Sequence, residues 1–197
     1  DGSTDRSGFI CDDIAGGRRA VKVIHQNNGG LSSARNTGLK NATGKYVFFL
    51  DSDDYIEENA LDSIKDLIEH SKVDLIRIYS YSFKADGSIE KSDEFTYKEK
   101  GYITDGRTYY EKGLRTKTLT VGAPKYVTAM NLIKDNGFFF MEGMLHEDEL
   151  WTPILLMSAG IPGISAMTSW AMVPALLSNA LPSSTSFCAA CEGTSTP

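Results

Sequence analysis

The stretch FFLDSDD, at residues 48–54, is an apolar run that ends in three acids within four residues. The apolar half is typical of a buried β-strand, so the acids are delivered to the carboxyl end of that strand. Carboxylates held this close repel one another unless a divalent cation lies between them. Asp51, Asp53 and Asp54 therefore predict a hard-metal site, and such a site at the end of an α/β strand most often serves a phosphate-bearing substrate.

On both sides of this stretch, strand-like and helix-like segments alternate. Strands are predicted at residues 21–25, 45–50 and 73–83, with a hairpin turn at 85–88, and helices at 31–42, 57–71, 104–113 and 125–136. The pattern is clearest at 57–71, where the apolar residues recur at helical spacing on one face. This alternation predicts an α/β domain with a mostly parallel central sheet flanked by helices.

Composition narrows the class of protein. The chain has 197 residues, of which 41% are hydrophobic and 23% charged, which is the balance of an ordinary globular domain. The net charge of −6 argues against a nucleic-acid partner, because neutralising phosphates requires a basic face. Three cysteines, Cys11, Cys188 and Cys191, are too few and too scattered for a disulfide framework, so a cytoplasmic location is expected.

The amino-acid composition of the chain changes after Pro153. Residues 154–197 contain a single charged residue, Glu192, among Ala, Ser, Gly, Pro, Met and Leu. Prolines interrupt the apolar stretches, so no run is long enough to predict a membrane span. We therefore divide the chain into a domain at 1–153 and a low-charge tail at 154–197. A buried helical tail, a disordered tail and an end foreign to the domain all remain open.

Four segments carry a family resemblance: DGSTD at 1–5, NGGLSSARNTG at 28–38, LDSDD at 50–54 and HEDELW at 146–151. In this order and spacing they resemble the bacterial family 2 glycosyltransferases, which are inverting enzymes with a GT-A fold. The resemblance covers residues 1–153. It implies that the family's N-terminal strand–helix–strand unit is truncated here. Sheet edges left unpaired by that loss would favour a homodimer.

The resemblance assigns the acids of the opening stretch to a D-x-D motif. Asp51 and Asp53 match the pair that holds Mg²⁺ or Mn²⁺ against the diphosphate of a nucleotide sugar, and Ser52 and Asp54 fall beside the donor. A bound metal would neutralise the charge on the departing diphosphate. The alternative is that these acids only cap the helix predicted from Glu57.

The segment at 146–151 matches the family's E-D motif. Asp148 corresponds to the general base that takes the proton of the acceptor hydroxyl. Glu147 and Trp151 are predicted to lie on the acceptor side. The alternatives are an acidic first helical turn for Glu147 and Glu149, and a packing role for Trp151.

The two N-terminal segments are predicted to bind the donor. Asp1, Gly2 and Ser3 match the end of a strand beside the nucleoside pocket. Gly30 and Arg35 belong to a loop and helix whose first N–H groups could face a phosphate. Turn formation alone would also explain Gly30. Arg35 could equally be a surface side chain that covers the helix.

Taken together, these motifs and the family resemblance imply a metal-dependent inverting glycosyltransferase of bacterial surface polysaccharide synthesis. The expected donor is a UDP-sugar and the expected acceptor a saccharide or a lipid-linked saccharide. A lipid-linked acceptor would bring this cytoplasmic enzyme to the inner face of the membrane as a peripheral protein. Two alternatives remain: a truncated GT-A module without activity, and another Mg²⁺-dependent enzyme such as a nucleotidyltransferase. The second has no need of the distant acid at Asp148.

Overall fold

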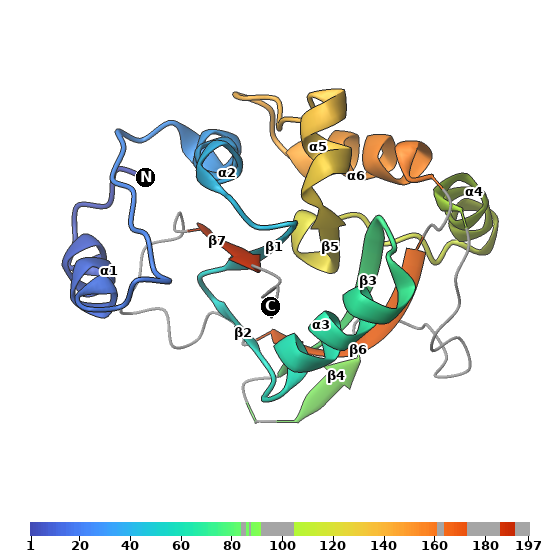
Figure 1. The fold of residues 1–197 in the computed structure, drawn as a ribbon, viewed down its shortest axis with the longest axis horizontal. Coiled ribbons are helices and arrows are strands. Elements are labelled where there is room, and N and C mark those ends of the chain that lie inside the picture. The colour runs from blue at the N-terminus through green and yellow to red at the C-terminus, as the bar shows by residue number, and fades with distance from the viewer. Residues whose placement is uncertain (84–85, 87, 92–104, 161–163, 173–185, 192–197) are drawn as a thin grey trace, which may run out of the picture.

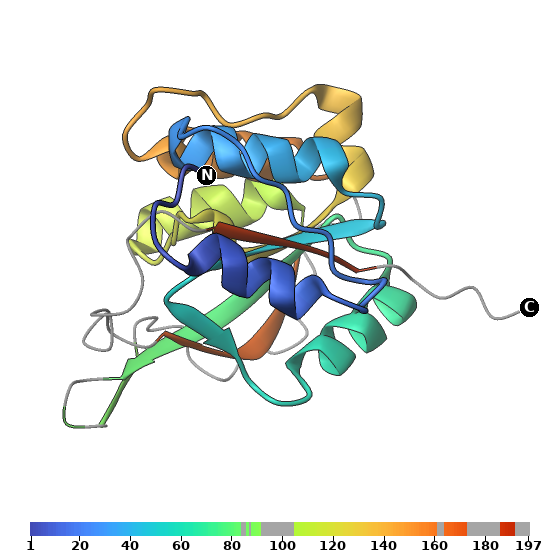
Figure 2. The same ribbon diagram turned by 90° about the vertical axis from the view of Figure 1, so that its left-hand side faces the viewer.

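The computed structural model describes residues 1–83, 86, 88–91, 105–160, 164–172 and 186–191, which form one sheet with helices on both faces (Figures 1 and 2). The strands are β1 (Tyr46–Asp51), β2 (Asp54–Ile56), β3 (Leu75–Phe83), β4 (Ile89–Lys91), β5 (Tyr126–Ala129), β6 (Ile164–Met172) and β7 (Ser186–Cys191). The helices are α1 (Ser7–Ala15), α2 (Gly30–Asn41), α3 (Ala60–Ser71), α4 (Gly106–Thr116), α5 (Met130–Asn136), α6 (Glu147–Ser158) and the 3₁₀ turn η2 (Ala123–Lys125). The predicted α/β class is confirmed.

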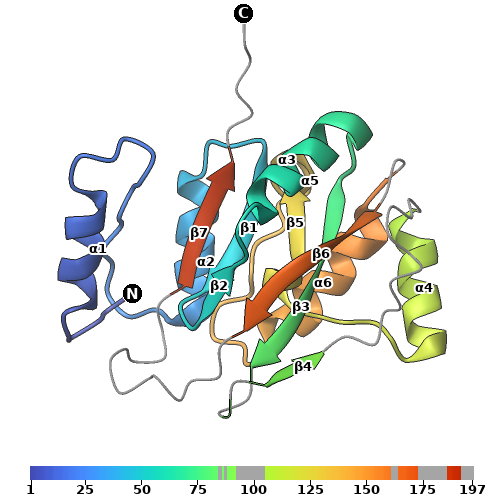
Figure 3. The ribbon, with the colours of Figure 1, turned by 90° about the horizontal axis from the view of Figure 1, so that it is seen from below.

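Strand direction differs from the prediction. The sheet order is β2–β6–β3–β5–β1–β7, with β4 beside β3 (Figure 3). Among the strands that the structure describes, only β3 and β6 run parallel. β1 is antiparallel to β5 and β7, β2 to β6, and β3 to β4 and β5. The prediction of a mostly parallel sheet is therefore wrong, because an apolar run locates a strand but does not specify its neighbour or direction.

The sheet separates two cores, and β1 supplies both because successive strand residues point to opposite faces. Val47 and Phe49 pack with α2, α4, α5 and α6, whereas Phe48 packs with α3. The exposed fraction of each of these three side chains is 2% or less. Complete burial of a large apolar side chain stabilises a fold by about 1.5–3 kcal/mol, so β1 is anchored firmly at the centre of the domain.

Two local predictions need correction. Residues 21–25 form no strand: Val21 and Ile24 remain 39% and 37% exposed, and no neighbouring strand pairs with them in the described sheet. The helix predicted at 125–136 begins as β5, whose four residues are all buried, and becomes helical at Met130. Burial between strands outweighs helical spacing there. Helix α1 was not predicted.

The segment after Pro153 continues the fold. Helix α6 passes through Pro153 and ends at Ser158, and both β6 and β7 pair within the sheet. Residues 161–163, 173–185 and 192–197 of the predicted tail lie outside the described residues. Within the described part of the chain, no helix is both long and apolar enough to cross a membrane.

Candidate active site

The three acids of the opening stretch lie at the junction of β1 and β2. Asp51 ends β1, Ser52 and Asp53 form the turn, and Asp54 begins β2. Burial, together with the negative charges of Asp53 and Asp51, raises the pKa of Asp54 to about 7, although the charge of Lys125 acts to lower it. The cluster therefore carries an excess of negative charge that a cation would relieve.

The residues present fit a metal shared with a substrate. Among the described residues, no three His, Cys, Asp or Glu side chains form a complete metal-binding group. The carboxylate oxygens of Asp51 and Asp53 are ligands that Mg²⁺ and Mn²⁺ prefer, and Mg²⁺ typically binds one or two carboxylates together with substrate phosphates.

The alternative that these acids only cap the following helix is wrong, since α3 begins after Asn59 and receives no side-chain cap.

Asp54 should make stability depend on pH in metal-free buffer. Its pKa of about 7 in the folded state exceeds the ordinary value of 3.8 for an aspartate, so the folded state holds more protons between these pH values and its stability falls as pH rises. Allowing for solvent screening of this partly exposed group, we expect a loss of about 1–2 kcal/mol from pH 5 to pH 8. Asp54→Asn should remove this loss in urea unfolding with EDTA. Asp66→Asn, an exposed acid on α3, is the control and should retain it.

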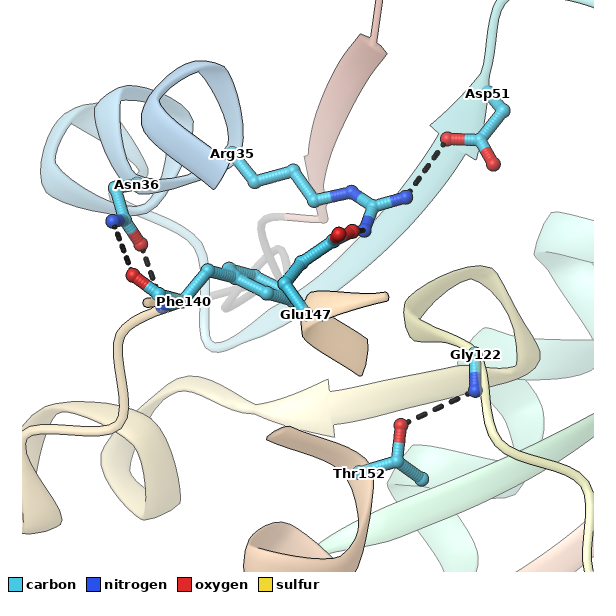
Figure 4. Close-up of polar contacts among 7 residues, drawn as sticks. All are labelled: Arg35, Asn36, Asp51, Gly122, Phe140, Glu147 and Thr152. Atoms are coloured by element: carbon cyan, nitrogen blue, oxygen red, sulfur yellow. Dashed lines mark hydrogen bonds and ion pairs between the residues drawn. The ribbon is translucent and has the colours of Figure 1, made fainter. Parts of the chain in front are cut away.

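Arg35 of α2 lies between the acid cluster and α6 (Figure 4). Its Nη2 donates to Oδ1 of Asp51 at 3.1 Å, and its Nη1 donates to Oε1 of Glu147 at 2.5 Å. The side chains of Arg35 and Glu147 are 2% and 8% exposed. The surface alternative for Arg35 is therefore wrong. Glu147 has its partner inside the protein, and its contact with an acceptor stays a prediction.

Aromatic residues surround this ion pair. The guanidinium carbon of Arg35 lies 5.3 Å from the ring centre of Phe140 and 5.9 Å from that of Phe49. Asn36 fixes Phe140 by accepting from its backbone N–H and donating to its carbonyl, at 2.8 and 2.9 Å (Figure 4). Trp151 stacks on Phe140 with ring centres 4.4 Å apart and is 3% exposed, which favours the packing alternative for Trp151.

Asp148 lies in the first turn of α6 and is partly exposed. In the described part of the chain its carboxylate has no hydrogen-bond partner, as suits a base that receives a proton from a substrate. A β-carbon at Gly122 would stand 3.8 Å from Oδ2 of Asp148, and Gly122 adopts φ +149°, which other residues rarely adopt. The Gly122 loop therefore forms a wall beside the predicted base.

Two residues near the site have no motif that would have identified them. Thr152 is fully buried, and its Oγ1 accepts from the backbone N–H of Gly122 at 3.2 Å, which ties the wall to α6 (Figure 4). Lys125 is 9% exposed and its charge acts on Asp54. Both depend on contacts between elements far apart in the sequence.

The N-terminal segment contacts the start of α2. Oδ1 of Asp1 accepts from the N–H of Gly29 at 2.9 Å, and Oδ2 accepts from the N–H of Gly30 at 3.0 Å. A β-carbon at Gly2 would stand 2.5 Å from Cβ of Asn28, so this approach requires glycine. The first N–H groups of α2 are thus bound by a carboxylate of the protein. Donor binding by Asp1, Gly2, Gly30 and the partly exposed Ser3 stays a prediction.

A family model matches most of this chain, and several known proteins are similar to parts of it. The profile described as "Glycosyl transferase family 2" matches residues 1–134. The uncharacterised glycosyltransferase EpsJ of Bacillus subtilis is 43% identical over 86 residues, or 44% of this chain and 25% of EpsJ. The minor teichoic acid biosynthesis protein GgaA of the same species is 36% identical over 138 residues, or 60% of this chain and 30% of GgaA. The chain thus spans less than a third of either relative.

Solved structures of S. aureus TarS are similar in fold. The match with the structure of TarS 1-349 covers 88% of this chain and 49% of the TarS chain, with a TM-score of 0.69 and 26% identity. The same protein in complex with UDP-GlcNAc has the same TM-score and identity, and the match covers 87% of this chain and 47% of that one.

Proposed function

The chain belongs to glycosyl transferase family 2, and from that premise we propose that it carries the catalytic core of a metal-dependent, inverting glycosyltransferase. One observation supports this most: a single buried arginine contacts both Asp51 of the acid cluster and Glu147, the neighbour of Asp148. The metal-binding and base-supplying motifs, far apart in the sequence, are thereby held on neighbouring elements. A transfer reaction needs both groups, one for the leaving diphosphate and one for the acceptor.

Asp148 would act as the general base. Its carboxylate would accept the proton of the acceptor hydroxyl as that oxygen forms a bond to the anomeric carbon. The bond from that carbon to the diphosphate oxygen would break in the same step, and its electron pair would leave with the diphosphate. A single displacement inverts the configuration at the anomeric carbon.

Asp51 and Asp53 would hold Mg²⁺ or Mn²⁺, with Ser52 and Asp54 beside the donor. When bound, the metal supplies Lewis-acid neutralisation of the diphosphate charge. The support is the chemistry of these side chains: three carboxylates close enough for Asp51 and Asp53 to raise the pKa of Asp54. The partly buried cluster also favours a cation by excluding part of the surrounding water.

The comparisons suggest the substrate class. The TarS complex with UDP-GlcNAc supports a UDP-sugar donor, and the name of GgaA supports an acceptor in cell-surface polymer synthesis. We place the enzyme in the cytoplasm, and at the inner face of the membrane when its acceptor is linked to a lipid.

Calorimetric titration tests the donor site directly. UDP, GDP and dTDP are titrated into the chain with and without Mn²⁺. Of the three nucleotides we expect only UDP to bind, and to do so with micromolar affinity only when Mn²⁺ is present. Asp53→Ala should weaken this binding at least about 100-fold, because it removes a carboxylate ligand of a metal that also holds the diphosphate.

Asp66→Ala, which removes an exposed acid from α3, serves as the matched control and should leave binding unchanged. Binding of UDP that is equal with EDTA and with Mn²⁺ would contradict the metal site. Binding of all three nucleotides would contradict a uracil-specific donor pocket. Binding without any release of UDP from a UDP-sugar would favour the inactive GT-A module.

A further inference from the structure

The position of Arg35 suggests a role beyond ordinary core packing. Each of its two terminal nitrogens contacts a different carboxylate, Asp51 Oδ1 at 3.1 Å and Glu147 Oε1 at 2.5 Å (Figure 4). The two acids lie 16 residues after and 112 residues after Arg35 in the sequence. A guanidinium is planar and rigid, so it fixes the separation of the two groups it bridges.

The surroundings hold the guanidinium in this position. Rings of Phe49 and Phe140 lie within 6 Å of it, and Phe140 is itself fixed by two hydrogen bonds to Asn36. The side chain of Arg35 is 2% exposed, so water screens its ion pair with Glu147, which is 8% exposed, only weakly; Asp51 is 35% exposed, and its ion pair with Arg35 is partly screened. Since packing of α2 fixes one end of Arg35, movement of either acid would have to stretch an ion pair or displace the aromatic rings.

The positive charge of Arg35 is shared between Asp51 and Glu147, and we call this arrangement the Arg35 bridge. One cation faces two anions, so a change in the charge of one carboxylate alters how strongly Arg35 attracts the other. Asp51 is the predicted metal ligand. Glu147 directly precedes the predicted base and opens the same helix. The bridge therefore connects the two halves of the candidate active site electrostatically as well as sterically.

We propose that Arg35 is a positioning residue that couples Asp51 of the metal site to the first turn of α6, where Asp148 lies. Arg35 itself contacts neither donor nor acceptor in this role. The catalytic meaning of this coupling rests on the proposed function. The ion-pair relay, by which we mean the two ion pairs that Arg35 forms with Asp51 and Glu147, can be tested by unfolding measurements without any substrate.

The first experiment measures the affinity for Mn²⁺ in the presence of UDP. Glu147→Gln leaves Arg35 with Asp51 alone, so Arg35 should draw Asp51 away from the metal and weaken Mn²⁺ binding by about fivefold to tenfold. Glu149→Gln is the matched control, because it removes the same charge from the same helical turn at an exposed position. Its effect should stay below about twofold. In an Arg35→Gln background, which removes the shared cation, Glu147→Gln should not weaken Mn²⁺ binding further.

The second experiment requires no ligand. Urea unfolding in EDTA compares Asp51→Asn, Glu147→Gln and the double variant. Either single change leaves Arg35 one anion, whereas both together leave a buried cation unpaired. The unfolding constant of the double variant should therefore exceed the value expected from the two single variants by about tenfold or more.

The outcomes separate the coupling from the proposed function. Additive single effects in urea would overturn the coupling, whatever the chain binds. Equal weakening of Mn²⁺ binding by Glu147→Gln and Glu149→Gln would also overturn it, because simple charge loss would then suffice. Non-additive unfolding in a chain that binds no UDP with Mn²⁺ would support the ion-pair relay and overturn the donor site instead.

Discussion

Asp148→Asn is expected to lower the rate of sugar transfer by about 10³-fold, within the range that a positioned general base contributes. The asparagine keeps the size of the side chain but cannot accept the proton of the attacking hydroxyl. Since Asp148 has no hydrogen-bond partner in the described part of the chain, the fold should be unaffected. The measurement is UDP released from UDP-GlcNAc with Mn²⁺, with water or added saccharides as acceptors.

The affinity for UDP with Mn²⁺ should stay within about twofold in Asp148→Asn, because the donor is held by other residues. Glu149→Gln again provides the control, since it changes a neighbouring acid of the same turn. A variant that retains full activity would refute Asp148 as the base. Loss of activity together with loss of UDP binding would mean that Asp148 serves the donor site.

Trp151→Ala is expected to lower the free energy of unfolding by about 3–5 kcal/mol, the usual cost of removing a large buried aromatic side chain. Trp151 is 3% exposed and stacks on Phe140, and its ring meets that of Phe49 edge to face at 5.7 Å. The variant would leave a cavity beside Phe49 and Phe140, the two rings that pack against the guanidinium of Arg35. Urea unfolding followed by circular dichroism gives the measurement.

Two neighbouring changes calibrate this result. Leu150→Ala alters a residue that is 38% exposed and should cost less than about 1 kcal/mol. Trp151→Phe keeps an aromatic ring and should recover part of the lost stability. If Trp151→Ala lost transfer activity but unfolded like the unaltered chain, the packing role would be refuted and the acceptor-wall alternative favoured.

The pattern of apolar residues along short stretches of sequence was sufficient to predict several of the strands and helices. The apolar run before Asp51 predicted β1, which the structure places at Tyr46–Asp51. The spacing of apolar residues predicted α2 and α3 nearly to their observed bounds. These predictions succeeded because a strand buried on both faces and an amphipathic helix each leave a signature in consecutive residues. The family also followed from short motifs, whose order along the chain is a property of the sequence itself.

The sequence by itself therefore determined the α/β class and the family, and it predicted Asp51, Asp53 and Asp148 as the acids of the site. Only the tertiary structure decided the strand directions, the burial of Trp151 and the bridge from Arg35 to Asp51 and Glu147. The physical reason is the range of the interactions. Hydrophobic periodicity and turn chemistry act between residues close in the chain. The buried ion pair of Arg35 and Glu147 instead joins residues 112 apart, and strand pairing brings Tyr46 of β1 against Cys191 of β7.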